Sequence, residues 1–335
     1  MTMEAAHTPG FQEEPMMAKD SRIYIAGHKG MVGSALVRCL QNDGYTNVIV
    51  PSERIELTDG DAVDKFFDAQ KPEFVCLAAA KVGGILANDT YPADFITINL
   101  QIQNNVIGAC FKHKVKKLLF LGSSCIYPKE APQPMKEEHL LSGKLELTND
   151  AYAIAKIAGI VMCKSYNRQH NTNYIAAMPT NLYGPGDNYN LHGSHVLPAM
   201  IRKFHEGKKE GKAAIELWGT GAPYREFLYV DDLAKACIQI LNHFNAPTDK
   251  EAEKMFFNMG CGYDITIKEL AEKVKSIVGF EGEIQWDTSK PDGTFRKLMD
   301  ISRLEAVGWK ATTSLDDGIQ LAYQWFLDNQ DSFRS

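Results

Sequence analysis

The sequence lacks three features that would each point to a particular class of protein. It has no C-x-x-C pair and no zinc-like Cys/His spacing, and its seven cysteines are scattered, as in a cytosolic protein with reduced thiols. No apolar stretch approaches the roughly 18–20 residues that span a bilayer. The net charge of −6 comes without a long basic run, which argues against a general nucleic-acid binder. We therefore expect a cytoplasmic protein with no metal site and no nucleic-acid or membrane partner.

The N-terminal segment is polar and lacks the apolar region of a secretion signal. It carries two adjacent acids, Glu13 and Glu14, and transit peptides are poor in acids. We therefore expect residues 1–20 to form a flexible tail. The remaining length suits two domains of roughly 100–200 residues each.

Short apolar runs alternate with helical patterns through the first half of the chain. The expected strands are Arg22–Ala26, Asn47–Val50, Phe74–Ala79, Lys117–Gly122 and Tyr174–Met178. The expected helices between them are Met31–Asn42, Asp61–Ala69, Tyr91–His113 and Asp150–Gln169. Continuous apolar strands separated by helices predict a parallel sheet covered on both faces. This is an α/β fold of the Rossmann-type, doubly wound kind, which binds ligands beyond the carboxyl ends of its strands.

The second half of the chain is less regular, with turn-rich patches between helices such as Ile267–Val278 and Leu315–Asn329. Loops on a rigid scaffold commonly determine substrate specificity. We therefore expect a smaller C-terminal α/β substrate domain. The expected division is a dinucleotide-binding domain of residues 21–185 plus about 228–250, and a substrate domain of residues 186–227 and 251–330.

A glycine-rich turn follows the first expected strand and precedes the first expected helix. It has a G-x-x-G-x-x-G spacing and consists of Gly27, His28, Lys29, Gly30, Met31, Val32 and Gly33. Glycines permit a tight turn and a close approach of the backbone to a pyrophosphate, and the helix N-terminus favours phosphate. Three glycines alone also occur in ordinary turns. Their place at the start of a strand–helix–strand series predicts a dinucleotide site.

The end of the second expected strand bears on the choice between NAD and NADP. NAD enzymes usually place an acid there to hold the ribose 2′-OH. Here Ser52 and Arg54 flank Glu53, and a hydroxyl near an arginine suits a 2′-phosphate better. We therefore predict NADP (NADPH) as the cofactor. Glu53 leaves NAD open, and Arg54 would otherwise be an ordinary surface charge.

Tyr152 and Lys156 form a Y-x-x-x-K pattern on an expected helix, where the i,i+4 spacing puts both side chains on one face. A phenol titrates near 10, about three units above neutrality, so an acid–base tyrosine needs a neighbouring cation. Lys156 can supply that charge and hold the cofactor ribose. The alternative is a surface pair. Ser123, at the end of the fourth expected strand, can hydrogen-bond a carbonyl that becomes an alcohol, so the context favours carbonyl chemistry.

Cys125 follows this serine by two positions and would lie beside the reacting carbonyl. A free cysteine is often a small packed hydrophobe. At the open end of a parallel strand, near a lysine and a cofactor, a reactive thiol is comparably favoured. A sugar dehydratase would carry an Asp-Glu pair here, and this segment has none.

Nine runs of the sequence resemble the GDP-L-fucose synthase family of extended short-chain dehydrogenases/reductases. They are Ala26–Ala35, Leu77–Asn88, Thr90–Phe95, Lys116–Lys129, Tyr152–Ile160, Met178–Asn188, Ser194–Ala199, Arg225–Ala234 and Ser289–Asp300. The resemblance covers essentially everything from about Ser21 to the C-terminus. It implies a bifunctional 3,5-epimerase and NADPH-dependent 4-reductase that converts GDP-4-dehydro-6-deoxy-D-mannose to GDP-L-fucose.

The resemblance also implies roles for individual residues. Cys125 acts as base and His195 as acid in the epimerisation, and Tyr152 protonates the alkoxide with help from Ser123 and Lys156. The further cofactor contacts that it implies are Leu121, Gly122, Pro179, Asn181, Leu182 and His195. The positions that it places near the GDP-sugar are Lys203, Trp218, Arg225, Asp292 and Lys297. The family forms homodimers, which implies an interface made by the helices Tyr91–His113 and Asp150–Gln169.

Two other functions remain open from the residues themselves. The first is a nucleotide-sugar 4-epimerase with tightly bound NAD, against which the Cys125 and His195 pair argues. The second is a non-catalytic NADP-binding regulator, against which the intact Ser, Tyr and Lys set argues. Net consumption of cofactor would separate the reductase from the 4-epimerase, and cofactor binding without turnover would indicate the regulator.

Overall fold

The computed structural model describes residues 10–191, 193–249, 251–290 and 292–330. The larger of its two lobes is built on a six-stranded parallel sheet in the order β10-β5-β4-β3-β1-β2. The strands are β1 (Ile23–Ala26), β2 (Val48–Ile49), β3 (Phe74–Leu77), β4 (Lys117–Leu121), β5 (Tyr174–Pro179) and β10 (Phe256–Met259). The five strands expected from apolar runs are confirmed. Apart from β2, every residue in these strands is buried, as in a sheet covered on both faces.

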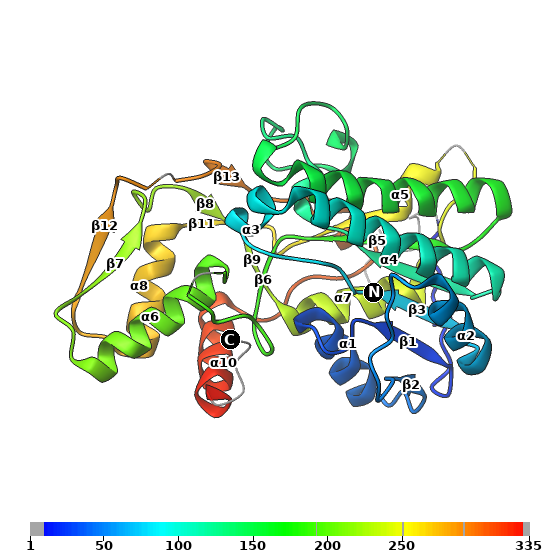
Figure 1. Ribbon diagram of the computed structural model, residues 1–335, viewed down its shortest axis with the longest axis horizontal. Coiled ribbons are helices and arrows are strands. Elements are labelled where there is room, and N and C mark those ends of the chain that lie inside the picture. Colours follow the sequence, from blue (N-terminus) through cyan, green and yellow to red (C-terminus); the bar gives the residue numbers. More distant parts are fainter. Residues whose placement is uncertain (1–9, 192, 250, 291, 331–335) are drawn as a thin grey trace.

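Helices cover both faces of this sheet (Figure 1). On one face α1 (Met31–Asn42) packs against α7 (Val230–His243), and on the other α4 (Pro92–Lys112) packs against α5 (Asp150–His170) and α2 (Gly60–Gln70). The short helix α3 (Ile85–Thr90) precedes α4. The strand order reverses at β1 and β3, so the crevice between their carboxyl ends is the place where a doubly wound fold binds its ligand.

The smaller lobe lies at the opposite end of the molecule and has its own core (Figure 1). It contains α6 (Val196–Glu210), α8 (Ile267–Val278) and α10 (Leu315–Asp328), and the parallel pair β7 (Ala214–Trp218) and β12 (Glu283–Asp287). Short strands join the lobes: β6 (Asn181–Tyr183) with β9 (Phe227–Tyr229), and β8 (Tyr224–Arg225) between β11 (Ile265–Thr266) and β13 (Arg296–Lys297). The chain passes between the lobes several times, so no single linker separates the two lobes in the described part of the sequence.

The sixth sheet strand differs from the expected division of the chain. Residues 251–330 were expected to belong to the substrate domain, but β10 pairs with β5 and α9 (Ser302–Ala306) packs on β10. Asn258 interrupts the apolar residues of this strand, so the sequence shows no continuous apolar run there. β10 belongs to the sheet because it pairs with the edge strand β5 and all of its residues are buried there.

The N-terminal segment also differs from expectation, because residues 10–20 are packed against the larger lobe. The backbone N–H of Gln12 donates to the His243 carbonyl over 2.7 Å, and Phe11 bridges to Phe244. The Met17 side chain is only 2% exposed. The expected flexible tail is therefore wrong for residues 10–20, and residues 1–9 lie outside the described residues. None of the described helices is long and apolar enough to cross a bilayer.

Candidate active site

The glycine-rich turn connects β1 to α1 at the reversal of the strand order. Gly27 has a φ of +90°, and a Cβ there would lie 2.7 Å from the Ala79 nitrogen, at the end of β3. A Cβ on Gly33 would lie 2.1 Å from the Gly27 carbonyl oxygen. The turn therefore requires glycine at both positions. His28 and Lys29 lie in the turn, whereas Met31 and Val32 are the first residues of α1, whose N-terminal N–H groups lie at the crevice.

The turn after β2 carries the two residues expected near the ribose. Ser52 is exposed, and Arg54 has a side chain 85% exposed with a guanidinium nitrogen 3.9 Å from the Glu56 carboxylate. Neither side chain is buried by other protein groups, so both are accessible to an anionic ligand. Such an exposed ion pair contributes little to stability.

Ser123, Tyr152 and Lys156 come together at the carboxyl end of β4. The Lys156 ammonium donates to the Leu121 carbonyl over 2.8 Å, and burial lowers its pKa to about 8. The ammonium also lies 5.8 Å from the centre of the Tyr152 ring. Burial raises the pKa of Tyr152, the nearby Cys125 adds to this, and a hydrogen bond with Ser123 opposes it. The phenol is therefore protonated at neutral pH and can donate a proton.

The remaining residues expected at the cofactor lie at the carboxyl ends of β4 and β5 and in β6, which follows them. A Cβ on Gly122 would lie 2.2 Å from the Met178 sulfur, so β4 and β5 approach closely here. Pro179 ends β5. The Asn181 amide donates to the Glu226 carbonyl over 2.8 Å, and Leu182 lies opposite Leu228 in the β6–β9 pair.

Cys125 lies in the 3-10 turn Ser124–Ile126, directly after β4. Its N–H donates to the Ser123 hydroxyl oxygen over 3.3 Å, and its side chain is half-buried. Two nitrogens approach its sulfur: the Asn149 amide at 3.5 Å and the Lys297 ammonium at 4.0 Å. The thiol expected to be reactive therefore has a cation and an amide donor beside it. Lys297, expected near the GDP-sugar, is brought to the thiol itself.

His195 is the residue immediately before α6, and its side chain is open to solvent on one side. The protein around the imidazole lowers its pKa, and the Lys297 ammonium lowers it further. Lys297 therefore acts on both Cys125 and His195. The structure places Lys297 beside the Cys125 sulfur and near enough to His195 to lower its pKa, although the three residues are far apart in the sequence.

Of the other residues expected near the GDP-sugar, Lys203, Trp218 and Asp292 lie in the smaller lobe, whereas Arg225 lies opposite Lys297 in the β8–β13 pair. The Trp218 ring is 65% exposed at the end of β7. The Lys203 ammonium donates to the Glu216 carbonyl over 3.1 Å, and burial lowers its pKa. Burial also lowers the pKa of Arg225, and Asp292 partly opposes this. Asp292 accepts from both the N–H and the hydroxyl of Thr220 over 2.7 Å.

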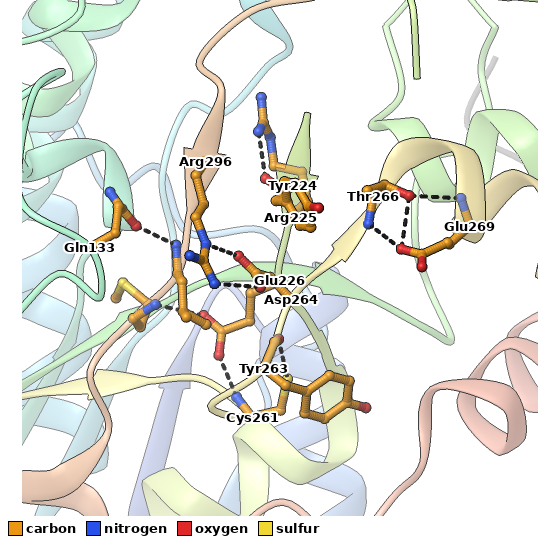
Figure 2. A network of polar contacts seen from close by, with 12 residues as sticks. Gln133, Tyr224, Arg225, Glu226, Cys261, Tyr263, Asp264, Thr266, Glu269 and Arg296 are labelled. Atoms are coloured by element: carbon orange, nitrogen blue, oxygen red, sulfur yellow. Dashed lines mark hydrogen bonds and ion pairs between the residues drawn. The ribbon is translucent and has the colours of Figure 1, made fainter. Parts of the chain in front are cut away.

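The sequence did not reveal the network under the site, which is centred on Glu226 (Figure 2). This side chain is fully buried, and its carboxylate accepts from the backbone N–H of Cys261 (2.7 Å), Gly262 (2.8 Å) and Met299 (3.0 Å). Burial raises its pKa. Because its partners are backbone groups of distant loops, no residue pattern could have indicated them. Nearby, Arg296 makes two bonds to the Asp264 carboxylate, at 2.6 and 3.0 Å.

A dinucleotide fold with a serine, a tyrosine and a lysine at the end of its fourth strand defines a short-chain dehydrogenase/reductase. The family model described as "NAD dependent epimerase/dehydratase family" matches residues 23–260. GDP-L-fucose synthase 1 of Arabidopsis thaliana is 54% identical over 97% of this chain and 98% of its own length. The chain therefore belongs to the NAD dependent epimerase/dehydratase family and, within it, to the GDP-L-fucose synthases.

Two solved structures give the same fold. A GDP-L-fucose synthetase from Naegleria fowleri bound to NADP superposes with a TM-score of 0.90 at 26% identity, covering 98% of this chain and 99% of its own. MlghC, a GDP-mannoheptose C4 reductase from Campylobacter jejuni with NADP bound, superposes with a TM-score of 0.84 at 42% identity, covering 93% and 99%.

Proposed function

We propose that this protein converts GDP-4-dehydro-6-deoxy-D-mannose to GDP-L-fucose, by epimerisation at C3 and C5 and an NADPH-dependent reduction at C4. The observation that carries the proposal is that Cys125 and Ser123 lie in the same turn, with Tyr152 and Lys297 beside them. A single C4 carbonyl held there is within reach of both the proton-transfer and the reducing groups. The GDP-L-fucose synthase relatives support the substrate.

The epimerisation requires a base and an acid on opposite faces of the sugar. The C4 carbonyl acidifies the C3 and C5 protons because it stabilises the carbanion as an enolate. Cys125 removes the proton, and the cation of Lys297 at 4.0 Å favours the negative charge on its sulfur. His195 returns a proton from the other face. Its lowered pKa makes the imidazolium a stronger acid.

The reduction uses the buried groups at the end of β4. The Ser123 hydroxyl holds the C4 oxygen, and Tyr152 gives it a proton while Lys156 favours the resulting phenolate. NADPH, when bound, supplies the hydride for C4. The glycine turn keeps its tight backbone only because Gly27 and Gly33 lack a Cβ, and it suits a pyrophosphate because it leads into the N-terminus of α1, whose free N–H groups favour phosphate. Lys156 suits the ribose, and Ser52 with Arg54 suits a 2′-phosphate.

The smaller lobe would hold the GDP part of the substrate. Lys203 and Arg225 supply positive charge for the diphosphate, and the exposed Trp218 ring offers a flat surface for the base. Asp292 is bonded to Thr220 and shapes the loop beside Arg225.

The proposal includes a homodimer in the cytoplasm. Helices α4 and α5 lie side by side on one face (Figure 1), and Ile154 and Val161 of α5 are 44% and 37% exposed there. A partner covering these side chains would remove apolar surface from water. All seven cysteines are free thiols, which suits a reducing compartment. Light scattering of the wild type and of Val161→Glu measures the assembly: a dimer that the charge dissociates supports it.

The test of the reaction is incubation with GDP-4-dehydro-6-deoxy-D-mannose and NADPH in D₂O, with the product analysed by NMR. Deuterium at C3 and C5, one NADPH consumed and the L-fucose configuration are expected. Cys125→Ser should suppress the deuterium incorporation while NADPH still binds. Cys261→Ser is the matched control, because a hydroxyl can keep the bonds of this half-buried thiol to the Phe227 and Tyr263 carbonyls.

Two results would contradict the proposal. A product that retains protium at C3 and C5 while NADPH is consumed would contradict the epimerisation and indicate a C4 reductase, the activity named for MlghC. Absence of NADPH consumption would exclude the reduction.

A further inference from the structure

Asn149 occupies a helix N-cap position without capping the helix. It immediately precedes α5, and its side chain makes no capping hydrogen bond. Asparagine at this position ordinarily accepts from a backbone N–H two or three residues further on. Asp59, Thr266 and Ser314 do so at the starts of α2, α8 and α10. The side chain of Asn149 therefore does not make the capping hydrogen bond that is usual at its position.

The amide of Asn149 is directed at the thiol instead. Its Nδ2 donates to the Cys125 sulfur over 3.5 Å. Its Oδ1 is buried and has no hydrogen-bond partner among the described residues. A buried acceptor without a partner costs free energy. Folding alone therefore does not explain why the amide adopts this orientation.

The surroundings of the sulfur indicate what the amide does there. A thiolate accepts hydrogen bonds and cannot donate them, so an amide N–H matches the basic form of Cys125. The charged or titratable groups that act on the sulfur are Lys297 from β13 and Tyr152 from α5, whereas the Ser123 hydroxyl accepts from the Cys125 backbone N–H. Lys297 provides charge on a flexible stem, whereas a planar amide immediately before a helix gives a fixed direction.

We infer that Asn149 is a positioning residue for the epimerisation, which holds the Cys125 sulfur toward the sugar with its amide N–H. The inference rests on the proposed function, because it assigns Cys125 the part of the base. Asn149 is the N-cap of α5 and lies three residues before Tyr152, which is on that helix. The base and the proton donor of the reduction are thereby aligned by one rigid element.

The first test needs no turnover: labelling of Cys125 by iodoacetamide at neutral pH, followed at the Cys125 peptide by mass spectrometry. Asn149→Asp has the same shape but loses the donor and adds an acid, so labelling should slow by about tenfold or more. The pH profile of labelling should move toward alkaline pH. Asn149→Ala should slow labelling less, because it also opens space beside the sulfur. Thr148→Ala is the matched control, since the bond of Thr148 to Glu146 uses its backbone N–H.

The second test separates positioning from a structural role. Asn149→Asp should lose deuterium incorporation at C3 and C5 in D₂O, yet keep the rate at which GDP-L-fucose and NADP form NADPH, since that step does not use Cys125. Wild-type labelling and exchange in Asn149→Asp would overturn the inference, as would an equal loss of both steps. If the wild-type protein itself incorporates no deuterium, the proposed function fails, whereas the labelling result still decides whether Asn149 acts on the thiol.

Discussion

The groups proposed for the two half-reactions are held in different ways. Ser123, Tyr152 and Lys156 all belong to the larger lobe: Tyr152 is hydrogen-bonded to Ser123, and the Lys156 ammonium lies 5.8 Å from the centre of the Tyr152 ring. The proton-transfer groups come from both lobes, because Cys125 follows β4, whereas His195 immediately precedes α6 and Lys297 lies on β13. The reducing geometry is thus fixed when the sheet folds, whereas the epimerising geometry also requires the lobes to be correctly placed.

The largest effect expected is on the reduction alone. Tyr152→Phe removes the proposed proton donor, so NADPH oxidation should fall by about 10²–10⁴-fold. Deuterium incorporation at C3 and C5 should change much less, because the ring remains and Cys125 keeps its partners. NADPH oxidation and NMR exchange on the same sample measure both. Equal losses would show that the two sets of groups are not separable.

A substitution in the glycine-rich cofactor turn should also impair the reduction while the epimerisation persists. Gly33→Ala puts a Cβ 2.1 Å from the Gly27 carbonyl oxygen, so the turn must shift. Overpacking of roughly 1–3 kcal/mol would weaken NADPH binding by roughly 5–150-fold. Fluorescence titration with NADPH measures the affinity, and solvent exchange should persist without cofactor. Gly108→Ala is the control, since a Cβ there has no neighbour within 4 Å; unweakened NADPH binding would contradict the site.

The larger lobe could be predicted from the sequence because its signals are local. Continuous apolar runs predicted five of the six sheet strands, and α1 has the expected bounds, Met31–Asn42. In the smaller lobe, α8 also has its expected bounds, Ile267–Val278. The glycine spacing and the Tyr152–Lys156 spacing also depend only on neighbouring residues. The resemblance singled out His195 and Lys297, which have no local pattern of their own.

The parts that sequence analysis missed depend on contacts between distant segments. Glu226 is a carboxylate satisfied by backbone N–H groups of two loops, and β10 is recognisable only beside β5. Residues 10–20 are polar on average, yet Met17 fills a place in the core. Asn149 resembles an ordinary helix cap in the sequence, and only the structure shows its amide turned to the thiol.

The connection between the lobes can be weakened at Glu226. Glu226→Gln replaces a carboxylate oxygen with an amide group that faces backbone N–H donors, which should cost about 1–3 kcal/mol of unfolding free energy for each acceptor lost. Urea denaturation measures the cost. Below the unfolding transition, solvent exchange should fall more than NADPH formation from GDP-L-fucose, because Met299, one of the donors, follows Lys297 by two residues. An equal fall in solvent exchange and in NADPH formation would contradict the idea that only the epimerising groups depend on the placement of the two lobes.

The smallest effect expected is electrostatic and tests whether the Lys297 cation, which lies beside Cys125, also acts on His195. Lys297→Met removes a cation that lowers the pKa of His195, while the burial that lowers it more remains. The pKa should therefore rise by less than about one unit, because solvent screens a partly exposed pair. It should stay below its ordinary value. NMR titration of the His195 ring over roughly pH 5–8 measures this directly. If His195 is the acid, the alkaline fall in solvent exchange should move to higher pH by the same amount.

Lys290→Met is the control, because that ammonium lies 5.5 Å from the centre of the Trp218 ring and is not among the charges that act on His195. An unshifted His195 titration in Lys297→Met would mean that the cation beside Cys125 does not reach the imidazole, and that the acid and the base are adjusted separately by their own lobes.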